Sequence, residues 1–183
     1  MSTPRLLLAT EASYLSHYAA RRRAGAGDRE VLTFEVDGER FAIDILRLRE
    51  IARFRPVTEV PRVPAGVLGI LALRGQVVPV LDLRIKLGRT PPPGGPAPTS
   101  RILVADLDGE PVGLAVDRVL GVVRLAATDI EPKTAALPID LACISAIARV
   151  GDDLFALVDV DAVAHLEWPE PRLGAGQRDD PRS

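Results

Sequence analysis

Side chains that usually ligate metals or act as nucleophiles are scarce in this sequence. The chain has one cysteine, Cys143, and two histidines, His17 and His165, which lie in different segments. A zinc site needs several closely spaced ligands of these types, so no metal site is expected. Cys143 stands between two apolar residues with no basic neighbour to activate its thiol. We therefore interpret Cys143 as a small core residue rather than a nucleophile.

Carboxylates are common, but they do not form the pairs that acid–base catalysis needs. Four aspartates fall near the predicted ends of strands: Asp44, Asp82, Asp117 and Asp159. Capping or ion pairing explains that placement better than a role as general acid or base. Residues 25–30 begin like a dinucleotide-binding loop but lack its final glycine and the preceding strand. We expect a protein that is not an enzyme and that has no cofactor or metal.

One arginine interrupts the most apolar stretch of the chain. Residues 69–83 are two nearly continuous aliphatic runs separated by Arg74-Gly75-Gln76. Glycine tolerates the positive φ of a tight turn, so this stretch predicts two buried strands joined as a hairpin with Arg74 at the bend. A guanidinium group does not lose its charge. Arg74 must therefore be paired within the protein or directed toward a partner.

The composition indicates a small all-β protein. Of the 183 residues, 47% are hydrophobic but only 4% are aromatic, so short runs of Val, Ile, Leu and Ala must build the core. A net charge of -2 and few aromatic residues disfavour nucleic-acid binding. A single cysteine excludes an intrachain disulfide, and no apolar run is long enough for an export signal or a membrane span. We expect a cytoplasmic protein without direct membrane insertion.

Two short patterns recur in the second half of the chain. Asp37-Gly38 precedes an alternating apolar run, and Asp108-Gly109 does the same 71 positions later. Residues 156–160 repeat the pattern of residues 79–83 at a distance of 77 positions. We interpret these repeats as two similar halves, each a small closed or nearly closed sheet, packed together because neither could bury enough surface alone. Chance similarity between hairpins is the alternative.

The ends of the chain and one internal segment differ from this pattern. Residues 1–29 place apolar residues on one face at helical spacing, which predicts an N-terminal helical extension. Residues 30–168 hold the predicted double barrel. Residues 169–183 are rich in glycine, proline and charge, which is typical of a disordered tail. Residues 90–99 are rich in proline and are expected to form a surface loop.

Six segments, taken in order, resemble the CheW family of chemotaxis coupling proteins. They are residues 41–45, 50–51, 57–61, 69–75, 78–83 and 112–117. The resemblance covers residue 31 to about residue 166 and implies two five-stranded barrels around a shared hydrophobic core, with short helices. It also implies a non-enzymatic adaptor. The expected partners are the cytoplasmic tip of methyl-accepting chemoreceptors and the regulatory domain of a CheA-type histidine kinase.

The positions that match the family imply a set of partner-binding residues in a groove between the barrels: Ile45, Leu48, Glu50, Ile51, Gly69, Arg74 and Val122. By this resemblance, the apolar side chains would bury against a receptor helix, while Arg74 and Glu50 would orient it through charge-assisted hydrogen bonds. In the alternative interpretation, Leu48 and Val122 are simply core residues. Arg74 would then pair internally with Glu50 or Asp82.

The sequence departs from the family pattern near both predicted hairpins. Ala72 replaces the asparagine that usually precedes the hairpin bend, and Ser145, Ala146 and Ala148 replace glycines in the second half. Added side chains could narrow a close approach between backbones, which leaves partner affinity and identity open. The alternative function is a diverged docking module that binds a different partner through its N-terminal helix.

Overall fold

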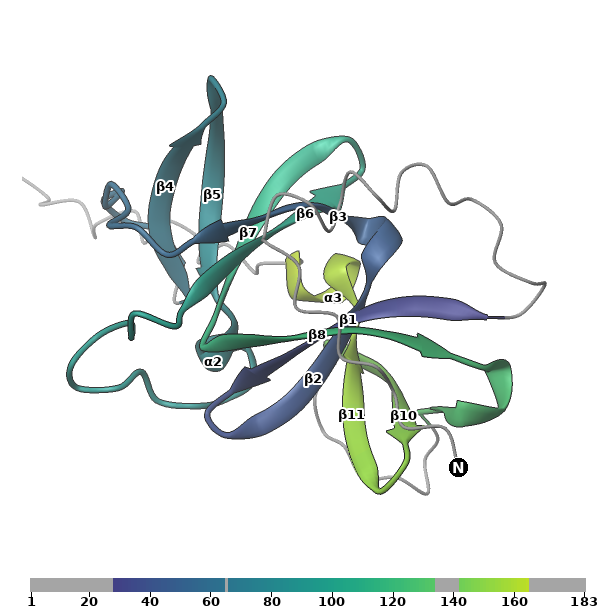
Figure 1. Cartoon of the computed structure of the whole chain (residues 1–183). Helices are drawn as coiled ribbons and strands as arrows, with labels where there is room; N and C mark the ends of the chain where they lie inside the picture. Colours follow the sequence, from purple (N-terminus) through teal and green to yellow (C-terminus); the bar gives the residue numbers. More distant parts are fainter. Residues whose placement is uncertain (1–27, 65, 134–141, 165–183) are drawn as a thin grey trace, which may run out of the picture.

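The computed structural model describes residues 28–64, 66–133 and 142–164, which form two β-sheets and four short helical turns (Figure 1). In spatial order, the first sheet contains β8 (Arg118–Leu125), β1 (Arg29–Val36), β2 (Glu39–Asp44), β11 (Asp153–Val158), β10 (Ile144–Val150) and β9 (Ile130–Pro132). The second sheet contains β3 (Leu48–Arg53), β6 (Arg101–Leu107), β7 (Glu110–Val116), β5 (Gln76–Asp82) and β4 (Val67–Leu73). The helical turns are η1 (Ile45–Arg47), α2 (Leu83–Lys86), η2 (Ala127–Asp129) and α3 (Val160–Ala164). In this described part of the chain, no helix has the length and apolar character to cross a membrane.

Each sheet closes into a barrel because the chain that follows one edge strand crosses to the opposite edge and forms backbone hydrogen bonds there. In the second sheet, Thr58 follows β3 and bridges Ile70 of β4 through two backbone hydrogen bonds, both with N···O distances of 2.8 Å. In the first sheet, the chain leaves β8, passes through η2 and returns as β9, which pairs with β10 at the opposite side of the sheet. The predicted double barrel is confirmed, but the first barrel has a sixth strand where five were expected.

The two barrels do not correspond to the two halves of the sequence. The β1–β2 hairpin joins β8, β10 and β11, with β2 parallel to β11, whereas the β6–β7 hairpin joins β3, β4 and β5, with β7 parallel to β5. The first hairpin of each half of the chain, β1–β2 or β6–β7, is therefore part of the barrel whose remaining strands come from the other half. The repeat itself is real. Arg49 on β3 and Leu120 on β8 are 71 positions apart and are the extra residues of corresponding β-bulges.

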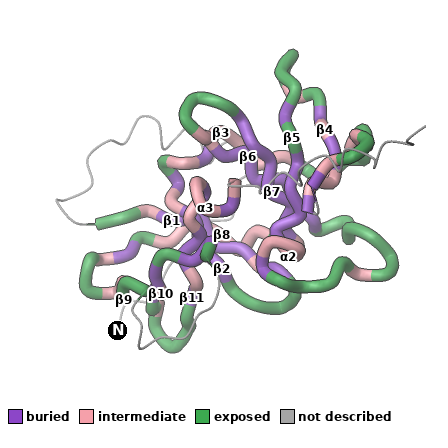
Figure 2. The backbone as a smooth tube through the Cα atoms, turned by 180° about the vertical axis from the view of Figure 1, so that it is seen from behind, coloured by how far each residue is buried: buried purple, intermediate pink, exposed green. Residues whose placement is uncertain are grey.

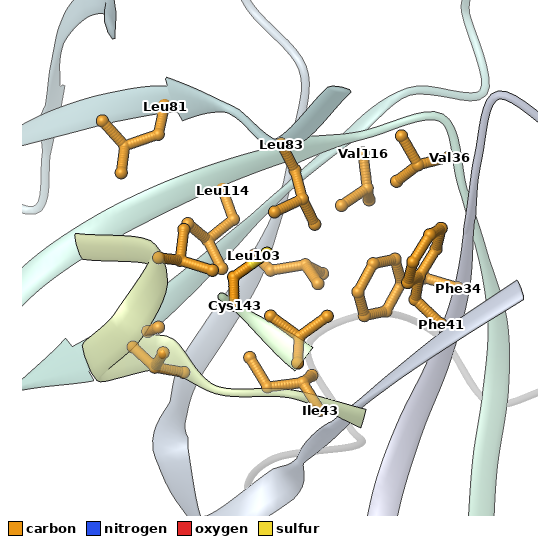
Figure 3. Packing of buried hydrophobic residues seen from close by; sticks show 14 of the residues in the cluster. Phe34, Val36, Phe41, Ile43, Leu81, Leu83, Leu103, Leu114, Val116 and Cys143 are labelled. Atoms are coloured by element: carbon orange, nitrogen blue, oxygen red, sulfur yellow. The ribbon is translucent and has the colours of Figure 1, made fainter. Parts of the chain in front are cut away.

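Most central strands are buried on both faces, which explains their nearly continuous apolar sequences. In the first barrel, Val31 and Ala42 belong to a hydrophobic cluster formed within that barrel. Their neighbours Leu32 and Ile43 face the other way and belong to a larger cluster that both sheets share. The second barrel alternates in the same way: its Leu103 and Leu114 join the shared cluster. Figure 3 shows side chains from both sheets meeting in this shared core.

Cys143 and the proline-rich loop lie where the sequence predicts them. Cys143 is 5% exposed and packs in the shared core, as predicted, and burial raises the pKa of its thiol. Residues 90–99 form an exposed loop between α2 and β6 (Figure 2).

Residues 1–27 and 165–183 lie outside the described residues. The N-terminal helix, the disordered tail and the segment boundaries therefore stay predictions.

The seam between β3 and β4 requires glycine at position 69. Gly69 has a φ of +148°, and a Cβ atom there would lie only 2.3 Å from the carbonyl oxygen of Thr58. We expect Gly69→Ala to lower the free energy of unfolding by about 3 kcal/mol, because the closing bridge must shift. Urea denaturation measures this loss.

Gly75 offers the matched control. It also has a positive φ, +81°, but apart from its chain neighbours no atom would lie within 4 Å of a Cβ atom at this position. Gly75→Ala should therefore cost only about 1 kcal/mol, the conformational penalty alone. Equal losses for the two variants would contradict the role of Gly69 in closing the barrel.

Candidate functional site

The hairpin bend predicted at residue 74 is present and projects Arg74 into solvent. β4 and β5 are joined by Arg74 and Gly75, whose φ angles are +48° and +81°. Two successive left-handed residues in a two-residue loop are typical of the turns that match the twist of paired strands. The Arg74 side chain is 81% exposed, at the tip of the hairpin that is green in Figure 2.

Arg74 forms an ion pair with Glu50 on β3. The Nη2 atom of Arg74 lies 2.8 Å from Oε2 of Glu50, whose side chain is only 19% exposed. Asp82, the other partner considered from the sequence, instead accepts a hydrogen bond from the backbone amide of Arg84. A pair with one highly exposed member contributes only about 0–1 kcal/mol, because water and salt screen it. Exchange of Glu50 for another carboxylate therefore costs little for Arg74 itself, whereas Glu50 then needs a new donor, because its side chain is mostly buried.

The ion pair stands at one mouth of the second barrel. A cavity of about 220 Å³ opens there, lined by Arg49, Glu50, Leu73, Arg74, Gln76, Val78, Val104 and Pro111. Val78 and Val104 are members of the cluster that fills this barrel. The site therefore combines an apolar floor with a charged rim, an arrangement that can hold an apolar side chain and orient its neighbours.

Arg49, which also lines this mouth, and Arg47 of η1 have partners inside the protein. Arg49 donates from Nε to Oδ2 of Asp106 at 2.7 Å and from Nη2 to the carbonyl oxygen of Gly109. The backbone amide of Gly109, followed by the Arg49 guanidinium, lowers the pKa of Asp106 and keeps it ionised. Arg47 of η1 pairs with Asp161 of α3, and this hydrogen bond raises the pKa of Arg47. Their charges hold the elements of the fold together.

The apolar residues expected to bind a partner contribute mainly to packing. Ile45 and Leu48 are 5% and 8% exposed, so for Leu48 the core interpretation agrees with the structure. Ile51 and Val122 are partly buried and pack against the shared core, which leaves one edge of each accessible. Gly69 is buried at the barrel seam. The ion pair brings Glu50 and Arg74 together, whereas none of the other predicted residues lines the cavity beside this pair.

Three large apolar side chains that the structure exposes were not among the predicted site residues: Leu46, Val77 and Leu154, the last of which is 51% exposed on β11. Leu46 is 79% exposed in η1, where the chain passes from the first barrel to the second. Val77 is 64% exposed and pairs with the exposed Ala72 on the outer face of the β4–β5 hairpin. Val77 and Val78 point to opposite faces of β5, and Val78 packs in the barrel cluster, so Val77 faces outward. The sequence alone gives no signal for this, because other strands bury both of two neighbouring apolar residues. The replacement of asparagine by Ala72 thus alters this outer face.

The four aspartates near strand ends act as caps and ion-pair partners, as predicted. Asp44, Asp82 and Asp159 each accept a hydrogen bond from the backbone amide two residues ahead, at 2.9 Å. Asp117 pairs with Arg84 of α2. Among the residues that the structure describes, no group of three or more His, Cys, Asp or Glu side chains could hold a metal ion.

Known proteins share both the sequence and the fold. The CheW-like domain family model matches residues 30–167. The chain is 33% identical over 147 residues to "Chemotaxis protein CheW" of Rhizobium meliloti (strain 1021), which covers 79% of this chain and 92% of that protein. It is 30% identical over 159 residues to "Chemotaxis protein CheW" of Helicobacter pylori (strain ATCC 700392 / 26695), covering 82% and 95%. The crystal structure of scaffolding protein TtCheW from Thermoanaerobacter tengcongensis matches with a TM-score of 0.71 and 27% identity, over 76% of this chain and 94% of that chain.

These comparisons agree with the architecture derived from the strands. The matched region, residues 30–167, contains nearly all of β1 and every later strand, so it covers both barrels and the core between them. The family resemblance inferred from six short segments is confirmed. The chain belongs to the CheW-like family.

Proposed function

We propose that the protein is an adaptor that couples the cytoplasmic tips of methyl-accepting chemoreceptors to the regulatory domain of a CheA-type histidine kinase. It acts in the cytoplasm by binding and performs no catalysis. Family membership supports the coupling role, because relatives are named as chemotaxis and scaffolding proteins. The observation that carries the receptor contact is Arg74, 81% exposed at the mouth of the second barrel beside Glu50.

The proposed receptor contact exchanges one ion pair for another. Arg74 leaves Glu50 and donates to a carboxylate on the receptor helix, while Glu50 stays on β3 and accepts from a receptor donor. Hydrogen bonds to charged groups contribute about 1.5–3 kcal/mol each, more than the exposed internal pair that they replace. The two charges thereby fix the orientation of the bound helix.

Apolar contact would come from the surface between the two barrels. Leu46 is exposed in η1, and Ile51 and Val122 are partly buried against the shared core. An amphipathic helix binds where an apolar strip is flanked by charges. Ile45 and Leu48, which are buried, would support this strip from beneath rather than contact the helix.

Reversal of the charge at position 74 tests the receptor contact. We expect Arg74→Asp to weaken binding of a soluble receptor-tip fragment at least tenfold, about 1.4 kcal/mol, because the new carboxylate stands beside Glu50 and repels the receptor acid. Calorimetric titration measures the affinity. The thermal unfolding midpoint should fall only slightly, because the introduced carboxylate repels the nearby Glu50 carboxylate but lies in solvent.

Arg149→Asp is the matched control, because Arg149 is exposed on β10 of the first barrel and the charge change is the same. It should leave receptor affinity unchanged. A folded Arg74→Asp protein with normal receptor affinity would remove Arg74 from the receptor contact.

Stability measurements distinguish a binding residue from an internal support. Arg74→Ala should lower the free energy of unfolding by about 1 kcal/mol or less, because Arg74 is 81% exposed and water can reach Glu50, 19% exposed, from the side that Arg74 leaves. Arg84→Ala should cost about 2 kcal/mol, because Arg84 and Asp117 are only 17% and 25% exposed and the carboxylate would lose its partner. Urea denaturation of both variants gives the comparison. A larger loss at Arg74 than at Arg84 would identify Arg74 as a structural residue.

A further inference from the structure

The second barrel has another open mouth, at the end opposite Arg74. A cavity of about 370 Å³ lies there. Its walls include Leu68 near the start of β4 and Ala115 near the end of β7, whereas Leu73 and Pro111 line the Arg74 mouth from the other ends of the same strands. The two cavities are therefore separate sites on one barrel.

Apolar groups enclose most of this second cavity. Phe54, Val57 and Leu68 pack against the cluster that fills the barrel and form one wall. Pro92 and neighbouring prolines of loop 90–99 also line the cavity; this loop is the long teal segment beside α2 in Figure 1. The volume falls within the range of small-ligand pockets, roughly 300–1,000 Å³.

The loop is fastened to the barrel at Ser100, which is 4% exposed. The Ser100 amide donates to the carbonyl oxygen of Ala97 at 2.9 Å, and its own carbonyl oxygen accepts from the Phe54 amide at 3.2 Å. The proline-rich segment is thereby held against the strand wall on one side.

Negative charge predominates in the cavity lining. Glu59, Asp82 and Asp117 contribute carboxylates, and Arg84 is the one basic residue among the lining residues. The guanidinium of Arg84 is paired with Asp117 through Nη2, and its buried Nε has no hydrogen-bond partner. Asp82 is 8% exposed, and its burial raises the pKa of the carboxyl group, although the Arg84 backbone amide opposes that rise. A cation in the cavity would offset the cost of burying this charge.

We propose that this cavity binds a small apolar molecule that carries a single ammonium group. The apolar part lies against Phe54 and the prolines of the loop, and the ammonium group donates hydrogen bonds to Asp82 and Asp117. The volume of about 370 Å³ leaves room for about twelve heavy atoms, at roughly 30 Å³ for each displaced water. This site is independent of the receptor contact at Arg74.

Binding in this cavity would affect the first barrel, because Asp117 is hydrogen-bonded to it. Asp117 Oδ2 accepts a hydrogen bond from the Asp37 amide, in the turn between β1 and β2, at 2.7 Å. The Asp117 amide in turn donates to the carbonyl oxygen of Glu35 on β1 at 3.0 Å. A cation that draws on the Asp117 carboxylate therefore changes a hydrogen bond between the two barrels. The Asp37 amide, outside the cavity, reports on it.

An NMR titration of the full chain tests the proposal with two probes of the same skeleton, 4-phenylbutylamine and 4-phenylbutyrate. The amine should shift the amide resonances of Leu68, Gly95 and Ala115 with one saturable Kd of about 0.1–1 mM. The Asp37 amide should shift with the same Kd. The carboxylate probe should bind at least tenfold more weakly, because the lining carboxylates repel it.

Glu59→Gln removes one lining charge at an exposed position, so the variant should fold normally. It should weaken amine binding about threefold. Glu110→Gln makes the same charge change at the exposed start of β7, away from the cavity, and should leave the Kd unchanged. The proposal is overturned if the amine gives no saturable shifts at the lining residues up to about 10 mM, or if the carboxylate binds equally well.

Discussion

The shared core between the two barrels is the constraint on which the rest of the structure depends. A barrel of five or six short strands has too little interior to bury all of its own apolar surface. Leu32 and Ile43 from the first sheet therefore pack with Leu103 and Leu114 from the second, as Figure 3 shows for three of them. These residues occupy equivalent positions, 71 residues apart in the chain. In the shared core, residues of one repeat therefore pack against the equivalent residues of the other repeat.

The exchange of hairpins makes this core continuous through the chain. β2 lies beside β11 and β7 lies beside β5, so each barrel contains strands from both halves of the sequence. Because both faces of the central strands are buried, their side chains are committed to packing. Turns and barrel mouths are left for binding. Arg74 occupies one mouth of the second barrel, and the acidic cavity occupies the other.

Local features were predictable because they depend on neighbours in the sequence. The bend at Arg74-Gly75 and the capping roles of Asp44, Asp82 and Asp159 follow from residue type and the position of strand ends. The exchange of hairpins was not predictable. The hydrophobic pattern shows which residues of a strand are buried. It does not show whether a hairpin pairs with strands of its own half or of the other half, because the two halves have similar patterns.

The candidate site shows the same division. The family resemblance supplied Glu50 and Arg74, but only the folded chain shows that they pair while Arg74 stays 81% exposed. Leu48 was ambiguous, because an apolar residue on a strand has the same pattern in a core or in a groove. The cavity beside loop 90–99 had no sequence signal, because its wall is a proline-rich segment without periodicity.

The most direct test of the proposed coupling role is to map the receptor-tip contact on the isotopically labelled full chain by NMR. We expect a soluble receptor-tip fragment to shift or broaden the amide resonances of Glu50, Ile51, Arg74 and Gly75, around one mouth of the second barrel. Changes confined to the first barrel, for example to the β10–β11 hairpin, would contradict this placement of the receptor.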